Sequence, residues 1–252
     1  MARPFASYIL CATPRSGSTL LCEMLGATGV AGRPNSFFRP EDIAEWARAW
    51  GLPDPDETDA PSFDRAYLSA LLREGRAGTG TFGLRLMWDS LAEASHRLNR
   101  ALGSDRDVAA QFEAAFGPPL YVHISRGDKV AQAVSRVRAE QSGIWHRAAD
   151  GKMQEGADSA QPLRYDGARI AEILDDLQRG DEAWRDFFDA HCIRPLTLSY
   201  EGVAQDPQAA LGTILSTLGL DPDLAHATPV RTSKLADAVS KAWEDRFRQE
   251  HP

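Results

Sequence analysis

The sequence predicts an α/β fold in three layers, with helices covering both faces of a central, mainly parallel sheet. Short apolar runs rich in β-branched or aromatic residues alternate along the chain with longer helical stretches. This alternation is typical of parallel strands joined by crossover helices. The chain has 252 residues, 43% of them hydrophobic and 25% charged, so it can bury one large core. Because no linker or internal repeat divides it, we expect a single domain over residues 1–252.

Four apolar runs predict the strands of the sheet. They are residues 7–12 (SYILCA), 81–88 (TFGLRLMW), 119–125 (PLYVHIS) and 193–199 (IRPLTLS). Short, nearly continuous apolar runs are typical of strands that are buried on both faces.

The predicted helices lie between and after these strands. Gly29 ends the first of them, and Pro40-Glu41-Asp42 begins the second, because proline and acidic residues favour the first turn of a helix. The helices are expected near residues 18–28, 40–50, 63–74, 90–101, 107–115, 128–142, 166–190, 207–218 and 236–249. Two polar stretches, 52–62 and 147–164, are expected to be loops that either line a binding site or form surface insertions.

Charge and composition exclude several classes of protein. The net charge of −8 argues against nucleic acid as the main partner, so any anion site must be local. No stretch approaches the ~20 apolar residues of a membrane span, and no secretory signal is visible at the N-terminus, so we expect a cytoplasmic protein. Cys11, Cys22 and Cys192 are too few and too scattered for a disulfide framework, and we expect them to be buried thiols.

The first strand leads into a loop of small residues within the segment ATPRSGSTLL, residues 12–21. With a helix starting near Ser18 or Thr19, backbone N–H groups and the positive end of the helix dipole point to one place and bind an anion there. Gly17 lets the backbone approach closely, the hydroxyls can donate hydrogen bonds, and Arg15 adds a mobile cation. The residues expected at this site are Pro14, Arg15, Ser16, Gly17, Ser18 and Thr19. Taken alone, the pattern fits an ordinary helix N-cap equally well.

The loop differs from the P-loop of nucleotide kinases, GxxxxGK[ST]. The first glycine is missing, and Ser18 stands where the lysine should be. Lysine and magnesium neutralise the γ-phosphoryl group in kinases. Asp89 follows the second strand and leaves a magnesium role open, so a kinase-like phosphotransferase remains an alternative.

Three segments together resemble the sulfotransferases that use 3′-phosphoadenosine 5′-phosphosulfate (PAPS). TPRSGSTLL resembles their 5′-phosphosulfate loop. HISRGDKVAQAVS, residues 123–135, resembles their 3′-phosphate motif, with Arg126 and Ser135 at the binding positions. The segment 196–220 is similar to a C-terminal segment of these enzymes that is mostly structural. PAPS carries anions at two sides of a ribose, and these two motifs supply one anion site each.

Within this superfamily, the segments GLRLMW, AQAVSRVRAEQSGIW and AWEDRFR look most like the bacterial Stf0-type group, which includes trehalose and lipopolysaccharide sulfotransferases. The resemblance runs from about residue 7 to 248. It implies a P-loop-like fold, PAPS as sulfuryl donor, adenosine 3′,5′-bisphosphate (PAP) as product, a small-molecule or glycan acceptor, and a homodimer. Transfer would be direct and need no metal, because cationic side chains can stabilise a sulfuryl group. Arg15 would stabilise the leaving phosphate, and Arg85 would either reach the sulfuryl oxygens or form a structural ion pair.

One segment departs from the Stf0 pattern. The group typically reads GEPxEFF, and the glutamate before Phe-Phe is taken as the general base; here the segment is GRPNSFF, with Ser36 at that position. A neutral serine cannot accept a proton at pH 7. Arg33, a cation where the group has an acid, indicates an anionic acceptor.

Three explanations for the missing base stay open. Another residue serves as base, or the acceptor is already ionised or strongly nucleophilic, or the protein is a PAPS-binding regulator without catalysis. The candidate bases are Glu41, Asp42, Asp89 and His146. Trp46, Trp50 and Trp145 are expected in the core, with an acceptor pocket or a dimer interface as alternatives.

Overall fold

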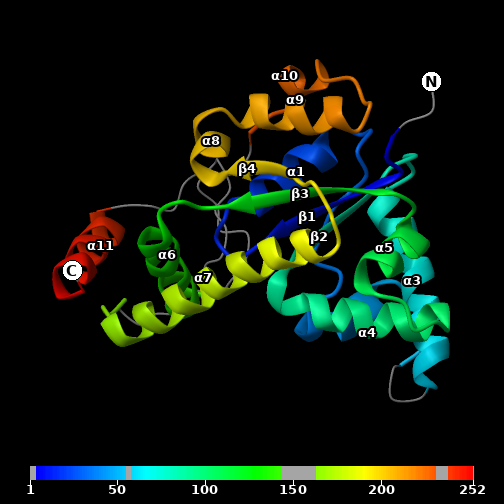
Figure 1. Ribbon diagram of the computed structural model, residues 1–252, viewed down its shortest axis with the longest axis horizontal. Coiled ribbons are helices and arrows are strands. Elements are labelled where there is room, and N and C mark those ends of the chain that lie inside the picture. The colour runs from blue at the N-terminus through cyan, green and yellow to red at the C-terminus, as the bar shows by residue number, and fades with distance from the viewer. Residues whose placement is uncertain (1–3, 55–57, 144–162, 231–237, 252) are drawn as a thin grey trace.

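A computed structural model describes residues 4–54, 58–143, 163–230 and 238–251. Four parallel strands form one sheet in the order β2-β1-β3-β4 (Figure 1), which confirms the predicted α/β class. The strands are β1 (Ser7–Ala12), β2 (Phe82–Met87), β3 (Pro119–Ser125) and β4 (Leu196–Ser199). β1 and β3 begin and end where the sequence predicts.

The central strand β1 has a neighbour on each side. Its first residue, Ser7, pairs with Phe82 of β2 and with Pro119 of β3, and every residue of β1 is buried. The connections that follow β1 and β2 therefore lead to opposite sides of β1. In open parallel sheets, ligands bind at such a switch point, outside the carboxyl ends of the strands.

Alternate residues of β1 face two different apolar layers. Ile9 and Cys11 pack against one set of helices, and Tyr8, Leu10 and Ala12 pack against the other. The first set is α2 (Ile43–Ala49), α3 (Ala60–Arg76), α4 (Leu91–Leu102), α5 (Val108–Phe116) and α7 (Gly167–Ala190). The second set is α1 (Ser18–Ala27), α8 (Tyr200–Gln205), α9 (Pro207–Thr217) and α10 (Leu224–Ala227). Figure 1 shows the sheet between α7 on one face and α1 and α9 on the other, which is the predicted three-layer arrangement.

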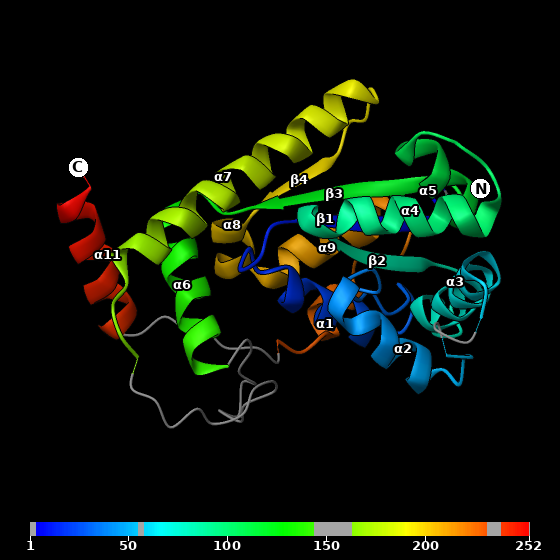
Figure 2. The ribbon, with the colours of Figure 1, turned by 90° about the horizontal axis from the view of Figure 1, so that it is seen from below.

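A smaller apolar cluster lies where the carboxyl ends of β3 and β4 lead into helices. α6 (Lys129–Ser142) packs there against α7 and against the C-terminal helix α11 (Ala238–Glu250), with Val134, Ile173 and Trp243 in the contact. In both ribbon views α11 lies at the opposite end of the molecule from the N-terminus (Figures 1 and 2). None of the helices in the described ranges is long and apolar enough to span a membrane.

Several predicted boundaries differ from the structure. The strand predicted at 193–199 begins only at Leu196, directly after Pro195, whose nitrogen cannot donate a sheet hydrogen bond, and the strand predicted at 81–88 covers 82–87. α3 begins at Ala60, inside the stretch 52–62 predicted as loop, because Asp59 caps the helix by accepting from the amide of Ser62 and a proline occupies the first turn. The helix predicted at 40–50 starts as a 3₁₀ turn, η1 (Pro40–Asp42), before α2. Three short elements were not predicted: η2 (Trp88–Ser90), α8 and α10. Most of the other predicted loop, residues 147–162, lies outside the described residues.

The cysteine prediction is right for two residues and wrong for one. Cys11 and Cys22 are buried, whereas Cys192 is exposed. Cys192 follows the end of α7 in a left-handed conformation, with φ of 53°, at a turn that faces solvent. Apolar neighbours in the sequence were therefore a poor guide to its burial.

Candidate functional site

A cavity of about 1110 Å³ opens at the carboxyl ends of the strands. Every strand contributes to its lining through the residues that follow it. The loop after β1 contributes Arg15, the end of β2 contributes Met87, the end of β3 leads to Arg126, and β4 leads to Tyr200. The cavity thus lies at the switch point where ligands of such sheets bind.

The loop after β1 turns the chain so that α1 points its first amides at the cavity. Arg15 and Gly17 both adopt the left-handed conformation, with φ of 66° and 85°. A β-carbon at Gly17 would lie 3.0 Å from Cδ2 of Tyr200, so both conformation and space require glycine. Because Gly17 is the N-cap and has no side chain to accept from the helix, the first amides of α1 can bind an anion instead.

Two guanidinium groups converge on this loop. The Nε of Arg15 donates to Oγ of Ser135 at 3.1 Å, and the guanidinium of Arg126 lies 4.3 Å from the ring centroid of Tyr200. Burial and the nearby charge of Arg126 lower the pKa of Arg15 to about 10. An anion bound between the two arginines would relieve this repulsion.

The Nε of Arg126 is buried and has no hydrogen-bond partner among the described residues. A buried donor without a partner costs about 1–3 kcal/mol. This unpaired donor and the two converging cations fit an anionic ligand. The structure therefore brings Arg126 and Ser135 to the same cavity as the loop 14–19.

Arg85 of β2 bridges two walls of the cavity. Its Nε donates to Oγ of Ser36 at 2.8 Å, and its Nη1 donates to Oγ1 of Thr19 at 2.7 Å. It forms no ion pair with any carboxylate of the described ranges. Arg85 thus joins the start of α1 to the segment that carries Ser36.

We call the first of these walls the loop wall: Pro14–Thr19 with Arg126, Ser135 and Tyr200. We call the second the turn wall: Ser36, Arg39, Asp42 and Trp46. In the turn wall, the amide of Arg39 donates to the carbonyl of Ser36 at 3.3 Å, and the amide of Asp42 donates to the carbonyl of Arg39 at 3.0 Å. All four residues of the turn wall line the cavity, whereas the intervening Phe37 and Phe38 pack into the core.

Other predicted residues lie in different places. Asp89 lines the cavity, is exposed and accepts from Oγ of Ser90 at 3.2 Å. Ser16 is fully buried and does not line the cavity. Arg33 is exposed and also lies off the cavity, so its position does not support the predicted anionic acceptor. His146 and Trp145 lie outside the described residues. The described ranges hold no group of three or more His, Cys, Asp or Glu that could share a metal ion.

The segment 196–220, predicted to be mostly structural, contributes directly to the site. Tyr200 contacts both Gly17 and Arg126. The carboxylate of Glu201 accepts from the amides of Gly127 and Asp128, at 3.1 and 3.4 Å, and so orients the loop that carries Arg126. Their position directly after a predicted parallel strand was the signal that could have found them.

A buried polar network that the sequence did not reveal holds the loop wall in place. Nε2 of Gln132 donates to Oγ1 of Thr13 at 3.0 Å and to the carbonyl of Pro14 at 2.7 Å. Oγ1 of Thr13 donates to Asp181 at 3.0 Å, and Lys129 pairs with the same carboxylate. These residues come from the loop after β1 and from α6 and α7, which are far apart in the sequence.

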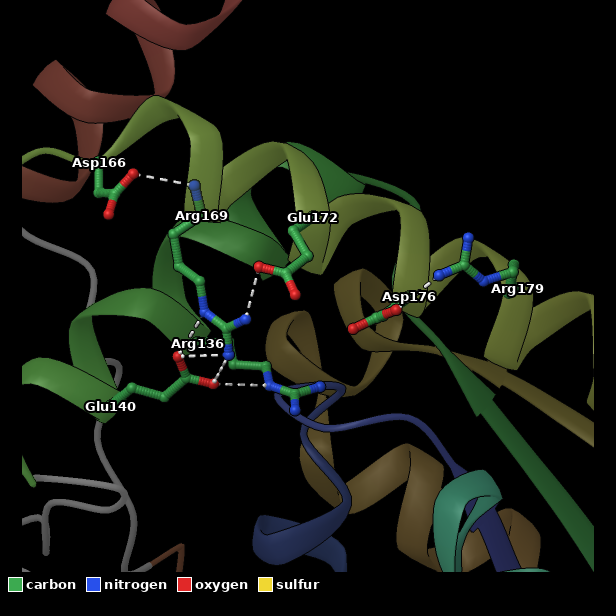
Figure 3. Close-up of polar contacts among 7 residues, drawn as sticks. All are labelled: Arg136, Glu140, Asp166, Arg169, Glu172, Asp176 and Arg179. Carbon is green, nitrogen blue, oxygen red and sulfur yellow. Dashed lines mark hydrogen bonds and ion pairs between the residues drawn. The ribbon is translucent and has the colours of Figure 1, made fainter.

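Two more arginines of α6 extend the positive lining of the cavity. Nε of Arg136 donates to Glu140 at 3.2 Å, and Arg169 of α7 donates to the same carboxylate at 3.1 Å, as Figure 3 shows. Arg138 also lines the cavity and contacts Ser240 of α11. A chain with net charge −8 thus gathers Arg15, Arg126, Arg136 and Arg138 at one site.

A family model and two curated proteins match almost the whole chain. The sequence model of the family described as Stf0 sulphotransferase matches residues 7–250. A trehalose 2-sulfotransferase of Mycobacterium tuberculosis is 32% identical over 269 residues, which cover 100% of this chain and 98% of that protein. A trehalose 2-sulfotransferase of Mycolicibacterium smegmatis is 31% identical, covering 97% of this chain and 95% of that protein.

Among solved structures, the sulfotransferase domain of the Synechococcus PCC 7002 olefin synthase overlaps with a TM-score of 0.43 at 19% identity, covering 96% of this chain and 86% of that domain. The family match runs from the first strand to the last helix, and it agrees with two relatives that align over almost their whole length. The chain therefore belongs to the Stf0 sulphotransferase family and is an enzyme that transfers sulfuryl groups.

Proposed function

We propose that the enzyme transfers a sulfuryl group from PAPS directly to a hydroxyl group of a carbohydrate acceptor. One observation supports PAPS as the donor. Arg15 and Arg126, two cations that follow separate strands, converge on the uncapped start of α1. The acceptor class is supported by the two relatives, which are named trehalose 2-sulfotransferases.

The loop wall suits the two anionic groups of PAPS. The first amides of α1 and the guanidinium of Arg15 would bind the 5′-phosphosulfate, because a helix N-terminus and a cation both stabilise negative charge. Arg126 and Ser135 would bind the 3′-phosphate, and the buried Nε of Arg126 is the donor that this phosphate would satisfy. A cavity of about 1110 Å³ has room for a nucleotide and an acceptor together.

Arg15 and Arg85 would act on the charges that change during transfer. Negative charge grows on the leaving phosphate, where Arg15 lies beside the start of α1. Arg85 is held between Ser36 and Thr19, so its guanidinium sits where the two walls meet and can donate to the sulfuryl oxygens.

The turn wall suits a neutral sugar. Arg39 and Asp42 offer donors and acceptors to hydroxyl groups, and two further carboxylates, Glu41 and Glu45, face the same cavity. These carboxylates would repel an anionic acceptor. Trp46 adds an apolar ring surface, which can pack against the C–H groups of a sugar.

Two measurements test the proposal. Calorimetry is expected to show tight PAP binding by the wild type and a loss of about 100-fold or more in Arg126→Ala. Arg126→Lys keeps the charge and serves as the matched control, with a smaller loss. Mass spectrometry of trehalose, and of a metabolite extract, incubated with the enzyme and PAPS is expected to show the gain of one sulfuryl group.

Each alternative function has its own outcome. Transfer from ATP that depends on magnesium and on Asp89, without PAP binding, would show a phosphotransferase. PAP binding with no sulfated product from any acceptor would show a nucleotide-binding regulator.

A further inference from the structure

The turn wall raises the question of how the acceptor hydroxyl loses its proton. Ser36, the residue of this wall in contact with Arg85, is neutral, and its oxygen already accepts a hydrogen bond from that guanidinium. It cannot act as a base at neutral pH. A carboxylate elsewhere on the same wall is therefore needed if the acceptor is an ordinary alcohol.

Two successive backbone turns lead from Ser36 to one carboxylate of the turn wall, that of Asp42. The two successive hydrogen bonds, from Arg39 to Ser36 and from Asp42 to Arg39, each span three residues. The second bond closes the 3₁₀ turn η1, whereas Arg39 itself is extended, with ψ of 119°. Ser36, Arg39 and Asp42 all line the cavity, and the two phenylalanines between Ser36 and Arg39 pack into the core.

Asp42 differs from the other carboxylates that line the cavity in its environment. The side chain of Asp42 is 32% exposed, compared with 70% for Glu41, and Asp89 is exposed at the end of β2. Glu45 is exposed. Glu244, whose side chain is 14% exposed, lies on α11, which packs against α6. Among the carboxylates of the described residues that line the cavity, only Asp42 is both half-buried and part of the segment from Ser36 to Trp46.

The carboxylate of Asp42 is only weakly paired with a cation. Its one ion pair within the described residues is with Nη1 of Arg39, which approaches a single carboxylate oxygen at 3.5 Å. Burial raises the pKa of Asp42 above its ordinary value, Glu41 and Glu45 raise it further, and Arg39 and Arg85 oppose this increase. A carboxylate with a raised pKa is a stronger proton acceptor than an ordinary one.

We propose that Asp42 is the general base that removes the proton from the acceptor hydroxyl. The proposal rests on the function proposed above. As the acceptor oxygen forms its bond to sulfur, the bond from sulfur to the 5′-phosphate oxygen breaks and its electron pair leaves with PAP. The proton of the hydroxyl passes to the carboxylate of Asp42, which later releases it to water. Trp46, one helical turn beyond Asp42, would hold the sugar ring against this wall.

The test is Asp42→Asn, assayed with the acceptor that the wild type sulfates. We expect kcat to fall by about 100-fold or more, as is usual for a lost general base, while the Kd of PAP stays within about twofold. The wild-type kcat is expected to rise with pH through the pKa of Asp42, because only the ionised carboxylate accepts a proton, and this acid limb should be absent from Asp42→Asn. Asp105→Asn, at an exposed position between α4 and α5, is the matched control.

The outcomes separate this inference from the proposed function. A wild type that sulfates no acceptor refutes the proposed function and, with it, the role of Asp42 as general base. A wild type that is active, with Asp42→Asn equally active, refutes the base alone. Loss of PAP binding in Asp42→Asn, or a loss of kcat in Asp89→Asn with Asp42→Asn unaffected, also overturns it.

Discussion

The loop wall and the turn wall face the same cavity but are built differently. The loop wall is held by buried contacts: Thr13 and Gln132 are almost inaccessible, and Asp181 joins them to α7. The turn wall runs from Ser36 through a short 3₁₀ turn into a two-turn helix, and the side chain of Arg39 is 55% exposed. A rigid site suits a donor that is the same for every acceptor. Residues on an exposed turn, in contrast, can be substituted without disturbing the fold.

The same difference explains which wall could be predicted. In the loop wall, glycine and small residues are required by backbone conformation, as at Gly17, so the sequence carries a recognisable pattern. In the turn wall, no backbone constraint requires an acid or a serine at position 36. The residues that act on the acceptor are therefore identified from their positions in the structure rather than from a sequence pattern.

The largest expected effect is on the support of the loop wall. Asp181→Ala would leave Lys129 and Thr13 without their buried partner, and breaking such a pair costs about 3–5 kcal/mol. We expect the free energy of unfolding, measured by chemical denaturation, to fall by about 3 kcal/mol, with weaker PAP binding. Asp181→Asn keeps an acceptor for Thr13 and should lose less. If Asp181→Ala were as stable as the wild type and bound PAP equally well, the two walls would not differ in rigidity as argued here.

Much of the fold was predictable because its signals are local. The strands β1 and β3 are buried on both faces, so their apolar runs mark them without ambiguity. The network of Thr13, Gln132 and Asp181 was not predictable, since it depends on three distant segments meeting. For Tyr200 the sequence offers a partial signal, its position directly after a predicted strand, but its contact with Gly17 depends on two distant segments meeting.

An intermediate effect is expected at the loop itself. Gly17→Ala adds a β-carbon 3.0 Å from the ring of Tyr200 at a left-handed residue, where a side chain costs about 1–2 kcal/mol. We expect PAP affinity to fall by about 10-fold or more, because the first amides of α1 must shift.

Gly29→Ala is the matched control: its φ is also positive, 70°, but nothing lies within 4 Å of the added carbon. Both variants should lose similar stability, and only Gly17→Ala should lose affinity in calorimetry. Equal PAP binding by the two variants would contradict the close-approach argument.

The smallest effect is expected on the turn wall. One part of the Trp46 side chain stacks on Trp50, with ring centroids 5.4 Å apart. Because Trp46 also lines the cavity, another part of its surface is available to an acceptor. Trp46→Ala removes that surface, and we expect KM for the acceptor to rise by about tenfold, equivalent to ~1.4 kcal/mol, with the Kd of PAP unchanged. Trp46→Phe keeps an apolar ring and should lie close to the wild type. Steady-state kinetics with varied acceptor, together with PAP calorimetry, would separate the walls. Equal losses in KM and in PAP binding would show that the two walls act as one unit, because a turn wall that only holds the acceptor has no means of weakening a nucleotide bound at Arg126.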